Sequence, residues 1–131
     1  IKAEKGWNPT IYNIRYIKPL DEELVRKACA THTRLVTVED GTIVGGLYGA
    51  VAEIVAAMEE PLPVKGVGIP DSFIGQATQE EQREDCGLSA ERLYGLFVDE
   101  FEKISKKVKK VRCLDKILLT FFDSYVKIII A

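Results

Sequence analysis

The feature that most restricts the fold is an alternation of short apolar runs with segments of helical periodicity between residues 10 and 69. Residues 10–17 mix β-branched and aromatic residues with polar ones at alternate positions, which is typical of a strand. A second run, at 35–38, is short and continuous, as expected for a strand covered on both faces, and a third strand is expected at 64–69. Successive strands are separated by enough chain for a helical crossover, so this order predicts a layered α/β fold with parallel neighbours.

Helix signals occupy the segments between these strands. Asp21 is followed by two glutamates, and a carboxylate there caps the free amides while acidic residues favour the positive end of the helix dipole. We expect this helix to end near His32. Apolar residues at three- and four-residue spacing from Leu47 to Met58 predict a second helix. The polar stretch at residues 75–85 is expected to hold a short surface helix.

The last part of the chain differs from the rest because no Gly or Pro follows Gly95. Apolar residues recur there every three or four positions, which favours helix. We therefore divide the chain into an α/β domain at residues 1–100 and an amphipathic helical extension at 101–131. A break is expected near residues 113–115, where Asp115 would cap a final helix.

Composition excludes several classes of partner. The 131 residues are 47% hydrophobic and 29% charged, which predicts one globular domain. A net charge of −2 provides no general attraction for nucleic acid, and the basic cluster at 103–112 alternates with apolar positions like a solvated helix face. The apolar stretch at 117–130 is interrupted by Asp123 and Lys127, so we expect no membrane span.

Residues that could carry chemistry are few. The single histidine is His32, and the three cysteines, Cys29, Cys86 and Cys113, are odd in number and widely spaced. This spacing argues against a disulfide framework, suits a reducing cytoplasm and offers no zinc site. We predict no catalytic or metal-binding residue in this chain.

The remaining candidate is the glycine pair Gly45 and Gly46, which precedes a predicted helix. Backbone amides at such a position can hold a phosphate or carboxylate, although glycines there more often permit close packing or a positive φ. Neither a dinucleotide-binding nor a P-loop pattern is present. We therefore name Gly45 and Gly46 as a candidate anion or interface contact. Glu39 and Asp40 follow a strand, where α/β sheets place their sites, but no partner for acid–base chemistry can be named.

The order of five sequence blocks adds a resemblance to a known family. Together they cover about residues 8–95 and resemble the C-terminal domain of the transketolase family. The block GIPDSFI followed by an acidic stretch and GL is most similar to the 1-deoxy-D-xylulose-5-phosphate synthase branch, with transketolase next. The five blocks are IRYIKPLDEELV at 14–25, RLVTVED at 34–40, GGLYGAVAEIV at 45–55, PVKGVGIPDSFI at 63–74 and EEQREDCGLSAERL at 80–93.

This resemblance implies a small three-layer α/β/α domain with a mixed, mainly parallel sheet. It implies a cytoplasmic parent enzyme that uses thiamine diphosphate and Mg²⁺ to transfer a two-carbon unit to an aldose phosphate, as in isoprenoid biosynthesis. In the family, other domains bind the cofactor, so this chain would support a homodimer and be inactive alone. Glu39 would then not be the catalytic glutamate, which belongs to another domain.

The sequence departs from the family in three respects. Tyr48 and Gly49 stand where the family has a Gly–Ser pair, so the helix start is bulkier and lacks a hydroxyl cap. A strand and helix expected ahead of residue 1 are absent, which predicts an open sheet edge and a chain that is part of something longer. The tail after about residue 100 would cover this edge or pair two copies. The alternative is a stand-alone interaction module that binds through the tail.

Overall fold

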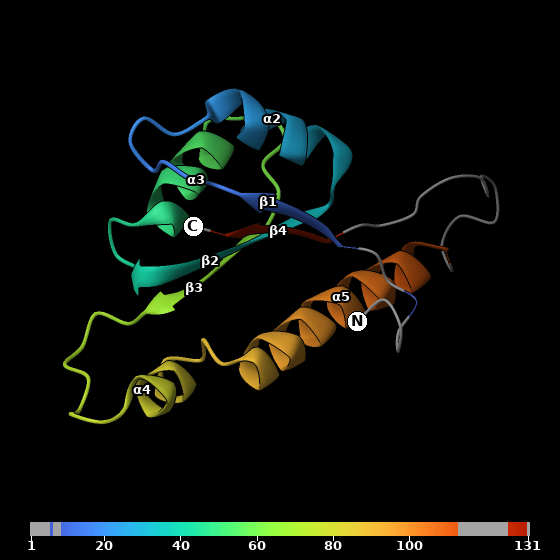
Figure 1. Cartoon of the computed structure of the whole chain (residues 1–131). Helices are drawn as coiled ribbons and strands as arrows, with labels where there is room; N and C mark the ends of the chain where they lie inside the picture. The colour runs from blue at the N-terminus through green and yellow to red at the C-terminus, as the bar shows by residue number, and fades with distance from the viewer. Residues whose placement is uncertain (1–5, 7–8, 113–125, 131) are drawn as a thin grey trace.

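A computed structural model describes residue 6, residues 9–112 and residues 126–130 of the chain (Figure 1). The elements alternate as predicted between residues 10 and 69, and two helices and a strand follow. In chain order they are β1 (Thr10–Asn13), α2 (Glu22–Thr31), β2 (Arg34–Thr42), α3 (Leu47–Ala56), β3 (Val64–Ile69), α4 (Gln79–Asp85), α5 (Ala90–Arg112) and β4 (Val126–Ile130).

The four strands form one sheet in the order β1-β4-β2-β3, and each described pairing is parallel. Helices α2 and α3 cover one face of the sheet, and α5 lies across the other (Figure 1). The predicted three-layer α/β class is therefore confirmed. The sheet was expected to be mixed, whereas the described strands are all parallel.

Two apolar clusters hold the layers together. The cluster between the sheet and the α2–α3 layer contains Leu35 of β2 and the apolar stripes of both helices. On the opposite face, Val36 and Val38 of β2 and Val67 of β3 pack against α5 and the residue Leu88 that precedes it. Alternate residues of β2 thus enter opposite clusters, as the side-chain period of a strand requires. The α5 side chains in this contact are Leu93, Leu96, Phe97 and Phe101.

Helix α2 begins and ends where its sequence signals indicate. The Oδ1 atom of Asp21 accepts a hydrogen bond from the Leu24 amide at 2.9 Å, and His32 is the C-cap. His32 also joins the helix end to the start of β1, because its Nε2 atom lies 3.2 Å from Thr10 Oγ1. The histidine predicted to be a helix-end residue is therefore part of the scaffold.

The predicted strands differ from the observed ones in length. Strand β1 ends at Asn13 rather than at residue 17, and the next residue, Ile14, is buried against α2. Strand β2 runs to Thr42, beyond the predicted end at Val38, with an irregular register between those two residues. This irregularity carries β2 past Glu39 and Asp40 to the edge where the candidate site lies.

The C-terminal extension requires a correction. It is helical as predicted as far as Arg112, but Val126–Ile130 is a strand rather than part of a final helix. The predicted break at 113–115 lies outside the described residues. In the described sheet β4 lies between β1 and β2, and β1 and β3 are the outer strands. Local periodicity cannot reveal this placement, because it depends on strands far away in the sequence. The open edge expected from a missing first strand stays a prediction.

Thr37 of β2 provides a test of the packing around the central strand. It is fully buried, and its Oγ1 atom has no hydrogen-bond partner among the described residues. A buried hydroxyl without a partner costs free energy, whereas a methyl group of the same shape does not. We expect Thr37→Val to leave the free energy of unfolding unchanged or to raise it by up to about 1 kcal/mol, measured by urea unfolding. A fall in the free energy of unfolding by more than about 1 kcal/mol would show that the Thr37 hydroxyl makes a hydrogen bond.

Candidate functional site

The candidate site lies at the carboxyl ends of β2 and β3, next to the beginning of α3 (Figure 1). Parallel α/β sheets place ligands at this edge because the loops that follow the strands meet there. At this point the predicted contact residues Gly45 and Gly46 meet Glu39, a residue for which the sequence indicated no chemical partner. Their arrangement decides whether the edge can accept an anion.

Glu39 closes the beginning of α3. Its carboxylate is buried, and its Oε2 atom accepts a hydrogen bond from the Leu47 amide at 2.7 Å. The Oε1 atom accepts a second bond from the Tyr48 amide at 3.0 Å. The N-cap residue Gly46 has no side chain to offer, so a carboxylate from the preceding strand caps the helix and faces the positive end of its dipole.

Glycines allow the carboxylate to come this close. A methyl carbon on Gly46 would overlap the Oε2 atom of Glu39 and the carbonyl oxygen of Thr42. On β3, a methyl carbon on Gly68 would lie 2.9 Å from Glu39 Cγ. Gly45 is required for a different reason, because its φ of 74° lies in the left-handed region.

Tyr48, the bulky departure from the family pattern, packs over a third glycine. A methyl carbon on Gly66 of β3 would lie 2.5 Å from the Tyr48 ring. Gly66 and Gly68 flank Val67, so both present bare backbone to the same face of the sheet. The larger residue at the helix start is thus accommodated by the absence of a side chain on the neighbouring strand.

The two glycines of the predicted contact have different structural roles. Close packing at Gly46 and a positive φ at Gly45 are both observed. The Leu47 and Tyr48 amides, which an external anion would use, are already bonded to Glu39. An anion or interface contact at Gly45 and Gly46 stays a prediction. The cap by Glu39 was missed because it lies eight residues before the helix and beyond any local capping pattern.

Removing the charge of Glu39 should weaken the fold. In Glu39→Gln one carboxylate oxygen becomes an NH₂ group, which cannot accept the second amide bond and faces a backbone N–H. We expect the free energy of unfolding to fall by about 2 kcal/mol. Urea unfolding would measure this change, with Glu53→Gln on the exposed side of α3 as the matched control. Equal small losses for both variants would contradict the role of Glu39.

A pocket beside this edge is too small for a large cofactor. Its volume is about 200 Å³, and it lies between the ends of β2 and β3 and helix α4. Asp40 and Arg83 form an ion pair of 2.9 Å at its wall. Ligand pockets usually have about 300–1,000 Å³. Cys86 also lines the pocket, whereas His32 lies beside Thr10 at the opposite end of the sheet, so the two cannot act together.

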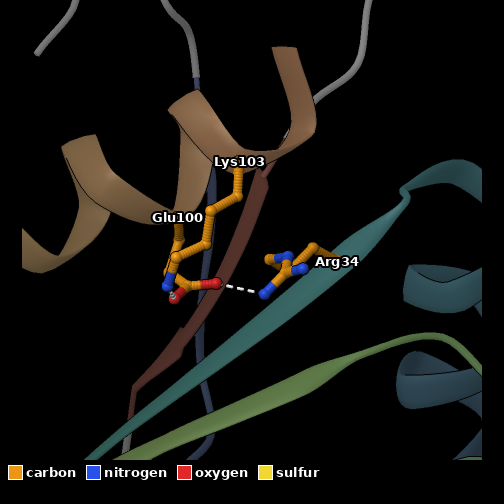
Figure 2. A network of polar contacts seen from close by, with 3 residues as sticks. All are labelled: Arg34, Glu100 and Lys103. Carbon is orange, nitrogen blue, oxygen red and sulfur yellow. Dashed lines mark hydrogen bonds and ion pairs between the residues drawn. The ribbon is translucent and has the colours of Figure 1, made fainter. Parts of the chain in front are cut away.

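A polar network that sequence reasoning missed holds α5 on the sheet (Figure 2). Arg34 at the start of β2 pairs with Glu100 of α5, and Lys103 Nζ lies 2.5 Å from Glu100 Oε1. The Glu100 side chain is only 5% exposed. Burial raises the pKa of this carboxyl, but the hydrogen bond from Lys103 and the charge of Arg34 outweigh burial, so the pKa lies below 4.5. Partners 66 residues apart leave no local signal.

Two kinds of feature are absent from the part of the chain that the structure describes. Among the described residues, His, Cys, Asp and Glu side chains form no group of three that could hold a metal ion. No helix within the described part of the chain has the length and apolar character to cross a membrane. Of the basic cluster at 103–112, the structure describes the side chain of Lys103 alone, and this side chain is largely exposed.

The parallel sheet between helical layers, with its carboxyl edge closed by its own glutamate, defines a layered α/β domain. Residues 2–93 match the family described as the transketolase C-terminal domain. The chain belongs to this family.

The comparisons also identify similar individual proteins. The chain is 45% identical over 89 residues to the 1-deoxy-D-xylulose-5-phosphate synthase of Escherichia coli O139:H28 (strain E24377A / ETEC). It has the same identity to the enzyme of that name from Shigella boydii serotype 18 (strain CDC 3083-94 / BS512). Each match covers 68% of this chain and 14% of the relative. The chain therefore spans a small part of the length of these relatives.

Proposed function

We propose that this chain is the supporting C-terminal domain of a thiamine-diphosphate-dependent enzyme of the 1-deoxy-D-xylulose-5-phosphate synthase kind. The parent enzyme would transfer a two-carbon unit to an aldose phosphate in isoprenoid biosynthesis. Family membership over residues 2–93 and 45% identity to enzymes of that name support this proposal. The isolated domain would have no activity.

The observation that carries the supporting role is the closure of the carboxyl edge by Glu39. The amides that would hold a cofactor diphosphate are used internally, at 2.7 and 3.0 Å from the carboxylate. The described residues also offer no group for Mg²⁺, and the adjacent pocket is small. These residues do not fit thiamine diphosphate, so we propose that other domains of the parent enzyme bind the cofactor and its metal.

The contribution of this domain would be to hold neighbouring parts of the enzyme in position. Helix α3 is held against β2 through Glu39 and packs on β3 through Tyr48, and α5 is held on the other face through Glu100. A scaffold held on both faces can present its loops at a constant position to a partner domain. We propose that the partners are the remaining domains of the enzyme and a second subunit of a homodimer in the cytoplasm.

A chimeric enzyme tests this proposal. Residues 2–93 would replace the matching segment of the Escherichia coli relative, and formation of 1-deoxy-D-xylulose 5-phosphate would be measured. We expect the chimera to make the product and the isolated chain to make none. A folded chimera without product, or an isolated chain that makes the product with thiamine diphosphate and Mg²⁺, would contradict the proposed function. The Glu53→Gln chimera, which changes an exposed residue, is the matched control.

A further inference from the structure

Exposed large apolar side chains gather at one end of the sheet. Among the described residues, four such side chains are exposed, and three of them follow a strand: Tyr16 after β1, Val44 after β2 and Phe73 after β3. Because the described strands are parallel, the loops that follow them lie at the same end of the sheet (Figure 1). We call the surface marked by these three side chains the carboxyl-edge surface. The side chain of Phe73 is fully exposed.

The loops after β2 and β3 are held in place by hydrogen bonds. The Ile43 amide donates a hydrogen bond to the Ile69 carbonyl oxygen at 2.9 Å, so the two loops begin side by side. Farther along the chain, Gln82 Nε2 of α4 donates a hydrogen bond to the Gly75 carbonyl oxygen at 3.0 Å. Phe73 is therefore displayed by a loop that is held at both ends. A loop that is already ordered loses little conformational entropy when a partner binds it.

The fold itself does not account for the three exposed side chains. None of them belongs to either apolar cluster that holds the layers together. Gly45, which follows Val44, is exposed, and a methyl carbon there would meet nothing within 4 Å. The predicted interface contact at Gly45 therefore lies in the same surface. Apolar side chains that gather on one surface, unlike scattered ones, indicate an interaction site.

The size of the carboxyl-edge surface indicates which kind of partner it fits. A buried aromatic side chain covers about 150–250 Å², so Tyr16 and Phe73 together with Val44 provide at most about 600 Å². An interface between free proteins usually buries about 800 Å² on each partner, whereas interfaces between domains of one chain begin at about 600 Å². A covalent linkage compensates for a smaller area, because it supplies an effective concentration of about 1 mM. The surface therefore fits a domain of the same polypeptide better than a separate protein or a second copy.

We infer that the carboxyl-edge surface docks on a neighbouring domain of the same polypeptide, and that the ring of Phe73 enters an apolar pocket of that domain. This inference rests on the proposed function, because the neighbouring domain would belong to the parent enzyme. The three exposed side chains all lie within residues 2–93, the part that matches the family, and the matched segment covers 14% of the relatives. The relatives therefore contain the additional polypeptide that this surface requires.

Thiol labelling can compare the surface in the isolated chain and in the chimeric enzyme. Ser72→Cys places a thiol on the exposed residue next to Phe73, and its modification by N-ethylmaleimide would be followed by mass spectrometry of the peptides. We expect the thiol to react at least about tenfold more slowly in the chimera, because docking covers it. Glu53→Cys, on the exposed side of α3, is the matched control and should react at the same rate in both proteins. Equal rates for Ser72→Cys in both proteins would overturn the inference.

A second substitution tests whether Phe73 anchors the surface. Phe73→Ser, added to Ser72→Cys, should leave the unfolding temperature of the isolated chain unchanged, because the ring belongs to neither apolar cluster. In the chimera, the same substitution should restore the labelling rate of the isolated chain. Ile11→Ser removes an exposed apolar side chain from within β1 instead, and should leave the slow rate of the chimera unchanged. Equal labelling rates in the Phe73→Ser and Ile11→Ser chimeras would overturn the role of Phe73.

Further outcomes separate this inference from the proposed function and from self-association. A chimera that forms product while Ser72→Cys reacts at the rate of the isolated chain would overturn the docking surface and leave the proposed function intact. A chimera that protects this thiol but forms no product would contradict the function and support the surface. Protection in the isolated chain that increases with its concentration would assign the surface to a second copy and would overturn the inference.

Discussion

Gly46→Ala should be among the most destabilising single-methyl substitutions in this domain, lowering the free energy of unfolding by about 3 kcal/mol. The added carbon would overlap both Glu39 Oε2 and the Thr42 carbonyl oxygen. Relief requires the carboxylate to move away, and the Leu47 and Tyr48 amides would then lose their acceptors. The substitution therefore combines overpacking with loss of the helix cap. Urea unfolding of the chain measures the change.

Gly49→Ala is the matched control for this prediction. Gly49 lies two residues into α3, and a methyl carbon there meets nothing within 4 Å. Alanine favours helix over glycine, so this variant should be more stable than the original chain by about 0.5–1 kcal/mol. The two substitutions make the same chemical change, one at the N-cap of α3 and one inside the helix, and they should change the free energy of unfolding in opposite directions. Similar effects of both would show that Glu39 does not occupy the helix end.

Arg34→Met should also be strongly destabilising, by about 2–3 kcal/mol at neutral pH. The substitution leaves the buried Glu100 carboxylate with Lys103 as its remaining partner in this network. Arg83→Met is the matched control, because the ion pair of Arg83 with Asp40 is exposed and should contribute less than about 1 kcal/mol. Equal losses for the two variants would contradict a buried clamp between β2 and α5.

The Arg34→Met effect should depend on pH in a defined direction. Because the pKa of Glu100 in the folded chain lies below 4.5, its ionised form stabilises the fold above that pH. This stabilisation is lost as the pH falls through the lowered pKa. The difference between the original chain and Arg34→Met should therefore narrow in acid, where Glu100 is protonated. If the difference in free energy of unfolding between the two chains stays constant from about pH 7 to about pH 3, the pair does not act through charge.

Local signals in the sequence predicted the elements that are determined locally. Asp21 caps α2 as its position indicates, and the apolar spacing from Leu47 predicts α3 correctly. Strand β3 has the predicted bounds, Val64–Ile69. In these segments the helix cap, the apolar periodicity and the residues that end each element all indicate the same structure. Tertiary contacts therefore do not change the locally preferred conformation.

The features that could not be predicted depend on residues far apart in the chain. Glu39 caps a helix that begins eight residues later, and Glu100 meets Arg34 across 66 residues. The run at 126–130 follows a long helical pattern without Gly or Pro, yet it pairs as a strand with β1 and β2. Its β-branched residues were the available signal. The glycine pair was recognised, but its carboxylate partner was not.

Titration of the isolated chain with thiamine diphosphate and Mg²⁺ tests the central claim most directly, namely that this domain supports a site built elsewhere. Isothermal calorimetry and thermal unfolding would be measured at up to millimolar cofactor. We predict no saturable heat and no rise in the unfolding temperature, because the edge is closed by Glu39. Saturable binding accompanied by a higher unfolding temperature would contradict the account.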